Sequence, residues 1–142
     1  MREYNLFISH AWRYSAHYDK VVEWLDIARV FGRLSYKNYS ASKDDPLVEL
    51  NQRMTKSELR AMLENQIRPS SVVIILAGMY AAYSEWIDFE IDTAVKMRKY
   101  IIGVEPWGQE RIPLKIQANK DIMVGWNGDS VINAILNSGR GS

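Results

Sequence analysis

The chain has no cysteine, and only two of its 142 residues are histidines. Without thiols, neither a disulfide framework nor a thiolate metal site is possible, and this composition fits a reducing cytoplasm. The two histidines, His10 and His17, belong to no HExxH pattern, which argues against a zinc site. We therefore expect a protein that uses no metal and no other cofactor.

Long apolar runs and a surplus of basic residues are also missing. No run approaches the roughly 20 apolar residues that a membrane-spanning helix needs, and the N-terminus begins with a strand-like segment rather than a signal peptide. The formal net charge is +1 with both signs interspersed, unlike the basic footprint of a nucleic-acid-binding protein. We expect a cytoplasmic protein with neither a membrane nor a nucleic acid as its partner.

Several catalytic motifs are absent as well. There is no GxGxxG or GxxxxGK[ST] loop, which excludes Rossmann-type dinucleotide binding and P-loop chemistry. There is no GxSxG elbow. The third strand-like segment ends in Leu76-Ala77-Gly78, where a phosphoacceptor receiver domain would need an aspartate. The loop after the first strand also lacks the Ser, Thr and Gly of a flavin phosphate cradle.

What the chain does contain is an alternation of strand and helix patterns. Strands are expected at Tyr4–Ser9, Leu34–Tyr39, Val72–Ala77, Tyr100–Val104 and Asp121–Gly125. Helices are expected at Tyr18–Phe31, Lys56–Ile67, Ser84–Lys99 and Val131–Leu136, and the connection Pro106–Lys120 shows no clear helix. This order predicts an α/β fold with a five-stranded parallel sheet in the order 2-1-3-4-5. One domain then covers residues 1–137, followed by a flexible tail over 138–142.

Glu90 is the residue that stands out against this pattern. Turning the helix Ser84–Lys99 by about 100° per residue places its other charges on one solvent stripe. Glu90 falls on the opposite side, among the apolar residues Trp86, Ile87, Ala94 and Met97. A carboxylate in apolar company costs free energy unless something pairs with it. The residues alone leave open whether Glu90 is structural or part of an active site.

The ligand crevice of such a sheet lies beyond the carboxyl ends of strands 1 and 3. Three loops should meet there: Ser9–Tyr14, Ser40–Leu47 and Gly78–Tyr83. With Ser84 as N-cap, Glu90 would lie about a turn and a half into its helix, near the crevice mouth. Ser9 and His10 are neighbours at a strand end, so their side chains point apart and form no dyad.

Most of these crevice residues also have a purely structural interpretation. His10 can serve as a loop hydrogen-bonding group, and Trp86 can serve as core packing. Asp44 and Asp45 before Pro46 can be ordinary turn residues.

At this point two motifs resemble those of the TIR domain superfamily. Phe7-Ile8-Ser9-His10 is similar to the box that closes the first TIR strand, and Ser84-x-Trp86-x-x-x-Glu90 is similar to the helix motif. Lys43-Asp44-Asp45-Pro46 falls where the family has its mobile loop. The chain looks closest to bacterial stand-alone TIR-like proteins, including those of the Thoeris anti-phage system, and a TIR domain has a three-layer flavodoxin-like fold.

The resemblance implies a function and a set of site residues. Catalytic TIR domains cleave the nicotinamide–ribose bond of NAD+, here a substrate, with the helix glutamate essential, which corresponds to Glu90. The substrate-binding residues expected on this basis are Ser9, His10, Trp12, Tyr14, Asp44, Asp45, Tyr83 and Trp86. The product would be an ADP-ribose-derived nucleotide, cyclic or conjugated, that acts on a separate effector protein. Self-association on activation is expected too.

Three departures from the family pattern and two alternatives remain. Asn5 stands where many members have an acid, the loop with Lys43-Asp44-Asp45-Pro46 lacks the usual Arg-Asp and Pro-Gly pairs, and Ile87 stands where a cysteine is common. One alternative is a non-catalytic TIR interaction module that binds through Ser40–Leu47. The other is a nucleoside-transferring enzyme, which also uses a carboxylate in a related fold.

Overall fold

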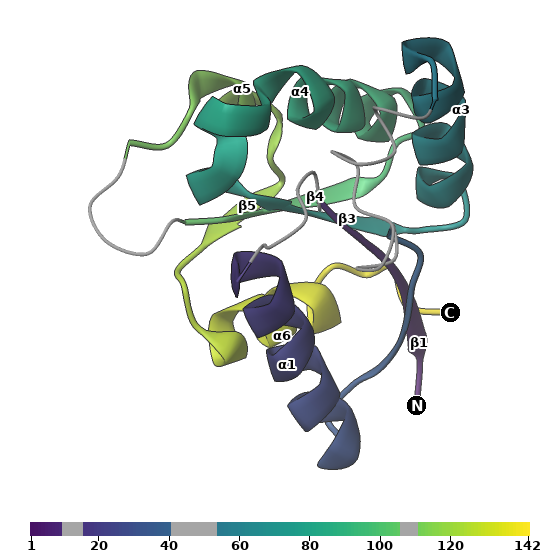
Figure 1. The fold of residues 1–142 in the computed structure, drawn as a ribbon. Helices are drawn as coiled ribbons and strands as arrows, with labels where there is room; N and C mark the ends of the chain where they lie inside the picture. The colour runs from purple at the N-terminus through teal and green to yellow at the C-terminus, as the bar shows by residue number, and fades with distance from the viewer. Residues whose placement is uncertain (10–15, 41–53, 106–110) are drawn as a thin grey trace.

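The computed structural model describes residues 1–9, 16–40, 54–105 and 111–142, with the backbone alone for residues 79–83 (Figure 1). The strands are β1 (Glu3–Ile8), β2 (Ser35–Asn38), β3 (Val72–Leu76), β4 (Tyr100–Val104) and β5 (Ile122–Val124). The helices are α1 (Ala16–Val30), α3 (Lys56–Ile67), the 3-10 turn η1 (Ala77–Met79), α4 (Tyr80–Lys96), α5 (Leu114–Asn119) and α6 (Gly128–Leu136).

The five strands form one parallel sheet in the order β2-β1-β3-β4-β5. This confirms the predicted flavodoxin-like topology. The central strand β3 is buried at every residue, in keeping with its uninterrupted Val-Val-Ile-Ile-Leu sequence. The edge strand β2 is short, with Tyr36 buried and Lys37 and Asn38 exposed.

Helices cover both faces of the sheet. Figure 1 shows α1 and α6 on one face and α3, α4 and α5 on the other. Each layer has its own core, and the side chains of β1 alternate between them. Leu6 and Ile8 belong to the α1/α6 core, whereas Phe7 belongs to the α3/α4/α5 core. By the same alternation, the residue after Ile8 points towards α4.

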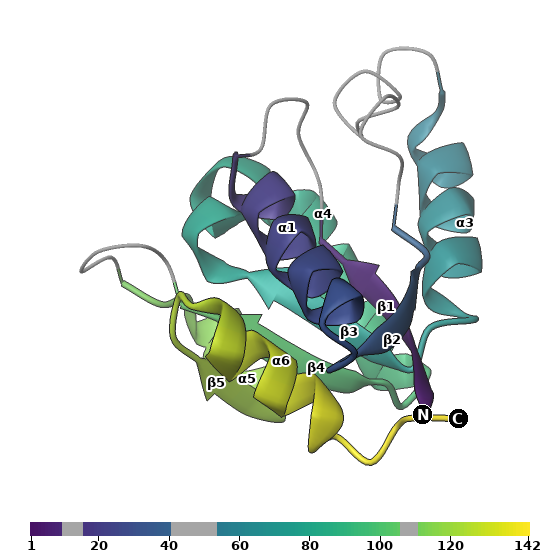
Figure 2. The ribbon, with the colours of Figure 1, turned by 90° about the horizontal axis from the view of Figure 1, so that it is seen from below.

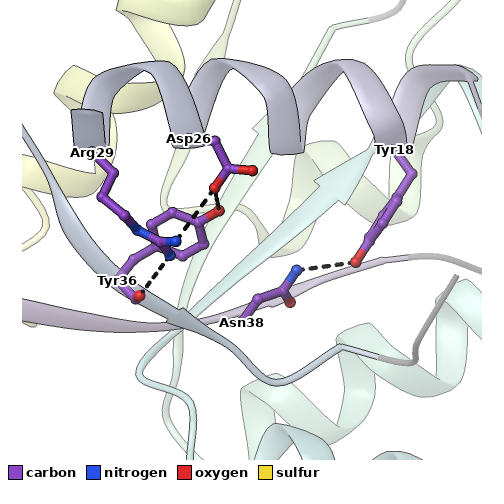
Figure 3. A network of polar contacts seen from close by, with 5 residues as sticks. All are labelled: Tyr18, Asp26, Arg29, Tyr36 and Asn38. Atoms are coloured by element: carbon purple, nitrogen blue, oxygen red, sulfur yellow. Dashed lines mark hydrogen bonds and ion pairs between the residues drawn. The ribbon is translucent and has the colours of Figure 1, made fainter. Parts of the chain in front are cut away.

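A polar network fastens the edge strand β2 to α1 (Figure 3). The Tyr36 hydroxyl donates to Asp26 at 2.6 Å, and the Arg29 guanidinium lies over the Tyr36 ring, 4.0 Å from its centre. Burial and the Asp26 carboxylate both raise the pKa of Tyr36. At the other end of β2, the Asn38 amide donates to the Tyr18 hydroxyl at 3.0 Å. The Tyr36 contacts hold β2 against the last turns of α1, and the Asn38–Tyr18 bond holds the carboxyl end of β2 against the first turn.

Two sequence-based helix assignments are corrected by the structure. The helix α4 begins at Tyr80, directly after η1, so Ser84 is an internal helix residue and not the N-cap. Glu85 and Asp88 therefore lie beyond its first turn, and Glu90 lies about three turns from its start. The segment Pro106–Lys120, predicted to lack a helix, contains α5. The predicted capping box of α3 is confirmed, with Thr55 and Glu58 bonded reciprocally at 3.1 Å.

The two ends of the chain lie side by side (Figure 2). Ser142 exchanges two backbone hydrogen bonds with Glu3, at 3.0 and 2.9 Å. Residues 138–142 thus have hydrogen-bond partners in the structure, and their flexibility stays a prediction. Within the described ranges, no helix combines the length and the apolar character that crossing a bilayer requires.

Candidate functional site

Ser9 lies at the carboxyl end of β1, one residue past the strand. Its backbone N–H donates to the Ile74 carbonyl at 2.9 Å, which extends the pairing with β3. Its side chain is fully buried and points towards α4, as the alternation along β1 requires. The Ser9 hydroxyl donates a hydrogen bond of 3.0 Å to Glu90 Oε1.

Glu90 is buried in the apolar layer between the sheet and α4, with 1% of its surface exposed. Its helix neighbours Trp86, Ile87 and Ile91 are also buried and belong to the core of that layer. This confirms the prediction that Glu90 lies on the apolar side of its helix. Of the charges predicted on the solvent stripe, Glu85, Asp92 and Lys96 are exposed, and Asp88 and Lys99 are partly buried. Glu85 and Asp92 pair with Lys56 and Lys115, and Lys99 lies beyond the end of α4.

Burial changes the acidity of Glu90. The loss of hydration raises its pKa to about 8, and the hydrogen bond from Ser9 works in the opposite direction. A carboxyl group with this pKa is mostly protonated at neutral pH while it stays buried. Titratable groups with strongly shifted pKa values occur preferentially at functional sites, although buried structural acids share the property.

The structure places only some of the predicted site residues. Ser9 and Glu90 are brought into direct contact, and Trp86 lies one turn before Glu90 on α4, with 7% of its surface exposed. His10, Trp12, Tyr14, Asp44 and Asp45 lie outside the described residues. Tyr83 lies in the first turn of α4, but its side chain is not described. Their roles stay predictions.

The Ser9–Glu90 contact was not foreseen from the sequence, although one signal for it exists. Ser9 has the same parity as Phe7 along β1, so both side chains face the α4 layer. A serine that follows two apolar strand residues into a buried layer needs a polar partner. On the facing helix, Glu90 is the carboxyl group that lies on the apolar side, whereas the other charged residues of that helix lie on the solvent side.

Two other kinds of site can be compared with the Ser9–Glu90 pair: a metal site and a surface groove. Within the described residues, no group of His, Cys, Asp or Glu side chains is arranged to hold a metal ion. An open groove of about 770 Å³ runs along α1, and its described lining residues include Val22, Ile27 and Phe31. It lies on the α1/α6 side of the sheet, away from the α4 layer, and neither Ser9 nor Glu90 lines it.

Comparison with protein families shows which family this chain belongs to. Residues 7–111, well over half of the chain, match the family described as Thoeris protein ThsB, TIR-like domain. The chain belongs to this TIR-like family. The matched range contains both Ser9 and Glu90, and it ends before α5, β5 and α6. A search of curated proteins finds no match. The family places this TIR protein among the components of Thoeris anti-phage defence.

Proposed function

We propose that this TIR protein cleaves the nicotinamide–ribose bond of NAD+ with Glu90 as its catalytic carboxylate. The observation that supports the proposal is the buried Ser9–Glu90 pair at the carboxyl end of β1. In open α/β sheets, ligands bind outside the carboxyl ends of the strands. Glu90 is held by one hydroxyl at this edge, and strongly shifted pKa values such as its raised pKa occur preferentially at functional sites.

Cleavage of this bond requires a carboxylate near the ribose and few other catalytic groups. When the bond between ribose C1′ and the nicotinamide nitrogen breaks, its electron pair leaves with nicotinamide, which departs as a neutral base. No general acid is therefore required. The ribose acquires oxocarbenium-like positive charge, which a nearby carboxylate stabilises while it accepts hydrogen bonds from the ribose hydroxyls. We assign this role to Glu90 and the positioning of its carboxylate to Ser9.

The burial of Glu90 implies that the site must open before it acts. With 1% of its surface exposed, Glu90 cannot contact a substrate in this state of the protein. Opening would hydrate the carboxyl group and lower its pKa from about 8 towards the ordinary value, so that it ionises at neutral pH. We propose that self-association on activation drives this opening. The resting protein would then be inactive because its carboxyl group is both covered and neutral.

The remaining parts of the proposal concern the substrate contacts and the product. His10, Trp12, Tyr14, Asp44, Asp45, Tyr83 and Trp86 are the residues proposed to bind the dinucleotide. Attack by water would give ADP-ribose, whereas attack by the adenine ring or another nucleophile would give a cyclic or conjugated nucleotide. We propose a cyclic or conjugated product that signals to a separate effector protein in the cytoplasm.

The test measures nicotinamide release from NAD+ by purified protein, with and without infected-cell lysate or forced oligomerisation. Glu90→Gln should abolish release under every condition in which the parent protein is active. Glu85→Gln is the matched control, because Glu85 lies on the same helix but is exposed and paired with Lys56. Equal activity of Glu90→Gln and the parent would refute the role of Glu90. Mass spectrometry of the nucleotide would identify the product.

The complete burial of Glu90 also supports a second candidate function, a non-catalytic TIR interaction module. In that case Glu90 would only connect α4 to β1 through Ser9. No NAD+ would be consumed in any assembly state, and Glu90→Gln would leave partner binding unchanged. Two measurements are therefore made together: nicotinamide release by the parent protein, which separates the two functions, and partner binding by Glu90→Gln.

A further inference from the structure

Three cations gather at the edge of the sheet where the strands begin. Arg68 ends α3 as its C-cap, Lys99 lies between α4 and β4, and Arg140 lies in the C-terminal segment. Backbone contacts fix their mutual placement. The Lys99 ammonium donates to the Arg68 carbonyl at 2.8 Å, and the Ser71 hydroxyl, next to β3, donates to the Arg140 carbonyl at 3.1 Å. We call these three residues the basic cluster.

The helix ends explain only part of the cluster. The Arg140 guanidinium donates to the Arg98 carbonyl at 2.9 Å, just as Lys99 does to Arg68, so each serves a carbonyl at a helix C-terminus. The Arg68 guanidinium also donates to Asn65 Oδ1 at 2.8 Å, one turn earlier on α3. An ammonium has three donors and a guanidinium has five, so most of the N–H groups of the cluster have no partner among the described residues. Among the described residues, no acid forms an ion pair with Arg68, Lys99 or Arg140.

The positive charges of the cluster repel one another. Partial burial lowers the pKa of Lys99, and the charges of Arg140 and Arg68 lower it further. The protein thus holds three cations close together, and no acid of the described part of the chain forms an ion pair with them. An anion with several negative charges that binds between the cations therefore stabilises such an arrangement.

We infer that the basic cluster is a binding site for a compact polyphosphate group, such as the diphosphate or triphosphate of a nucleotide. Two guanidinium forks and an ammonium on three separate segments can surround such a group from several sides. The site lies at the opposite edge of the sheet from Ser9 and Glu90, because Ser71 precedes β3 and Ser9 follows β1. It is therefore separate from the proposed NAD+ site and does not depend on the proposed catalysis.

The charge distribution favours a small anion over a nucleic acid. A nucleic-acid surface extends along many phosphates and needs a stripe of cations. Here the net charge of the whole chain is only +1, and the three cations of the cluster, with Arg98 beside them, lie at one end of the strands. A ligand that concentrates its charge in two or three neighbouring phosphates matches this geometry.

The test is a calorimetric titration of the full-length protein with inorganic tripolyphosphate at low salt. Saturable binding is expected, and Lys99→Gln and Arg140→Gln should each weaken it roughly tenfold, because each removes a charge-assisted contact. The charge-retaining variants Lys99→Arg and Arg140→Lys should keep most of the affinity. Lys120→Gln is the matched control, since its ammonium also donates to a carbonyl, that of Gln117, but outside the cluster.

A second measurement makes the test independent of how well the variants fold. In the parent protein, the amide NMR signals of Lys99 and Arg140 should shift on titration with tripolyphosphate, while that of Lys120 should not. Absence of saturable binding, or an equal loss of affinity in Lys120→Gln, would overturn the inference. So would tighter binding of duplex DNA that grows with duplex length, because it would show an extended nucleic-acid surface instead.

Discussion

The Ser9 hydroxyl lies 3.0 Å from Glu90 Oε1, and this hydrogen bond joins two residues that are 81 positions apart in the chain. It connects the end of β1 to the middle of α4 through a layer that is mostly apolar, with Thr93 of α4 as a further buried polar residue. Hydrogen bonds to charged or ionisable partners in such surroundings are stronger than at the surface, and losing one partner is costly. The pair therefore matters both for stability and for the proposed chemistry.

We first predict that Ser9→Ala lowers the free energy of unfolding by about 1–3 kcal/mol, because Glu90 loses its buried donor. The pKa of Glu90 should also rise further, since the hydrogen bond from Ser9 is the influence that lowers it. Urea unfolding at several pH values measures the first effect. Carboxyl NMR signals of Glu90 in the folded protein measure the second.

Ser70→Ala provides the control for this prediction. The Ser70 hydroxyl is also buried, but it donates to the Ile67 carbonyl at 2.6 Å and not to an acid. Its removal should cost a similar free energy at every pH and leave the Glu90 signals unchanged. Identical pH dependence of the two variants would contradict the proposed coupling between Ser9 and Glu90.

We next predict that the contribution of Glu90 to stability is lost as the pH rises from about 4.5 to about 8. Glu90 has a pKa of about 8 when folded against a reference value of 4.5, so in this range the folded state binds more protons than the unfolded state. The stability contribution of the buried neutral carboxyl is complete below pH 4.5 and is lost as the pH approaches 8. The total effect is of the order of 5 kcal/mol.

Glu90→Gln isolates this contribution, because a glutamine side chain has a similar size and does not titrate. The difference in unfolding free energy between the parent and Glu90→Gln should shift in favour of Glu90→Gln as the pH rises. The two proteins differ at this one residue, so the contributions of all other groups cancel in the difference. A difference that stays constant between pH 5 and pH 8 would show that Glu90 does not retain a proton on folding.

The sheet order was predictable from the sequence because it follows from local patterns. Strand and helix patterns alternate along the chain, and right-handed crossovers then allow few arrangements. The burial of Glu90 was predictable for a similar reason. It follows from the helical period of about 3.6 residues. The helix begins at Tyr80 and not at the predicted Ser84, but this does not change the side of the helix on which Glu90 lies.

The missed features depend on weaker or longer-range signals. Ser84 has the residue type of an N-cap, but Ala81 and Ala82 before it are strong helix formers and lie within α4. The helix α5 has six residues, begins after Pro113 without a side-chain cap and buries only Ile116, so its pattern is too short to detect. The Ser9–Glu90 contact depends on how α4 lies across β1, which no local pattern encodes.

Gly103 in β4 leaves space for side chains of the α5 layer, and we predict that Gly103→Ala lowers the free energy of unfolding by about 1 kcal/mol, because the flexible end of Met123 can move to make room. An added Cβ would lie 2.9 Å from Met123 Cε and 3.1 Å from Ile116 Cγ2. Gly125→Ala is the control, because its added Cβ would meet nothing closer than 3.5 Å. Shortening the neighbour in the double variant Gly103→Ala/Met123→Ala should restore space, so the two substitutions should cost less together than the sum of their separate costs. Strict additivity would contradict this explanation.

The helices α1 and α4 end with the same backbone geometry but have different residues at the left-handed position. Both α1 and α4 end in a Schellman motif: Arg33 N–H bonds the Ala28 carbonyl and Lys99 N–H bonds the Ala94 carbonyl, each at 2.9 Å. The left-handed residue of the first motif is Gly32, with φ of 72°, and that of the second is Arg98, with φ of 58°.

Because a side chain in this conformation costs roughly 1 kcal/mol, Arg98→Gly should raise the free energy of unfolding by about 0.5–1 kcal/mol. The reciprocal change Gly32→Ala should lower it by a similar amount, and open space around Gly32 ensures that the backbone alone is responsible. Thermal and urea unfolding of both variants measure these opposite changes. Destabilisation by Arg98→Gly would instead show that the Arg98 side chain makes a contact worth more than the backbone strain it imposes.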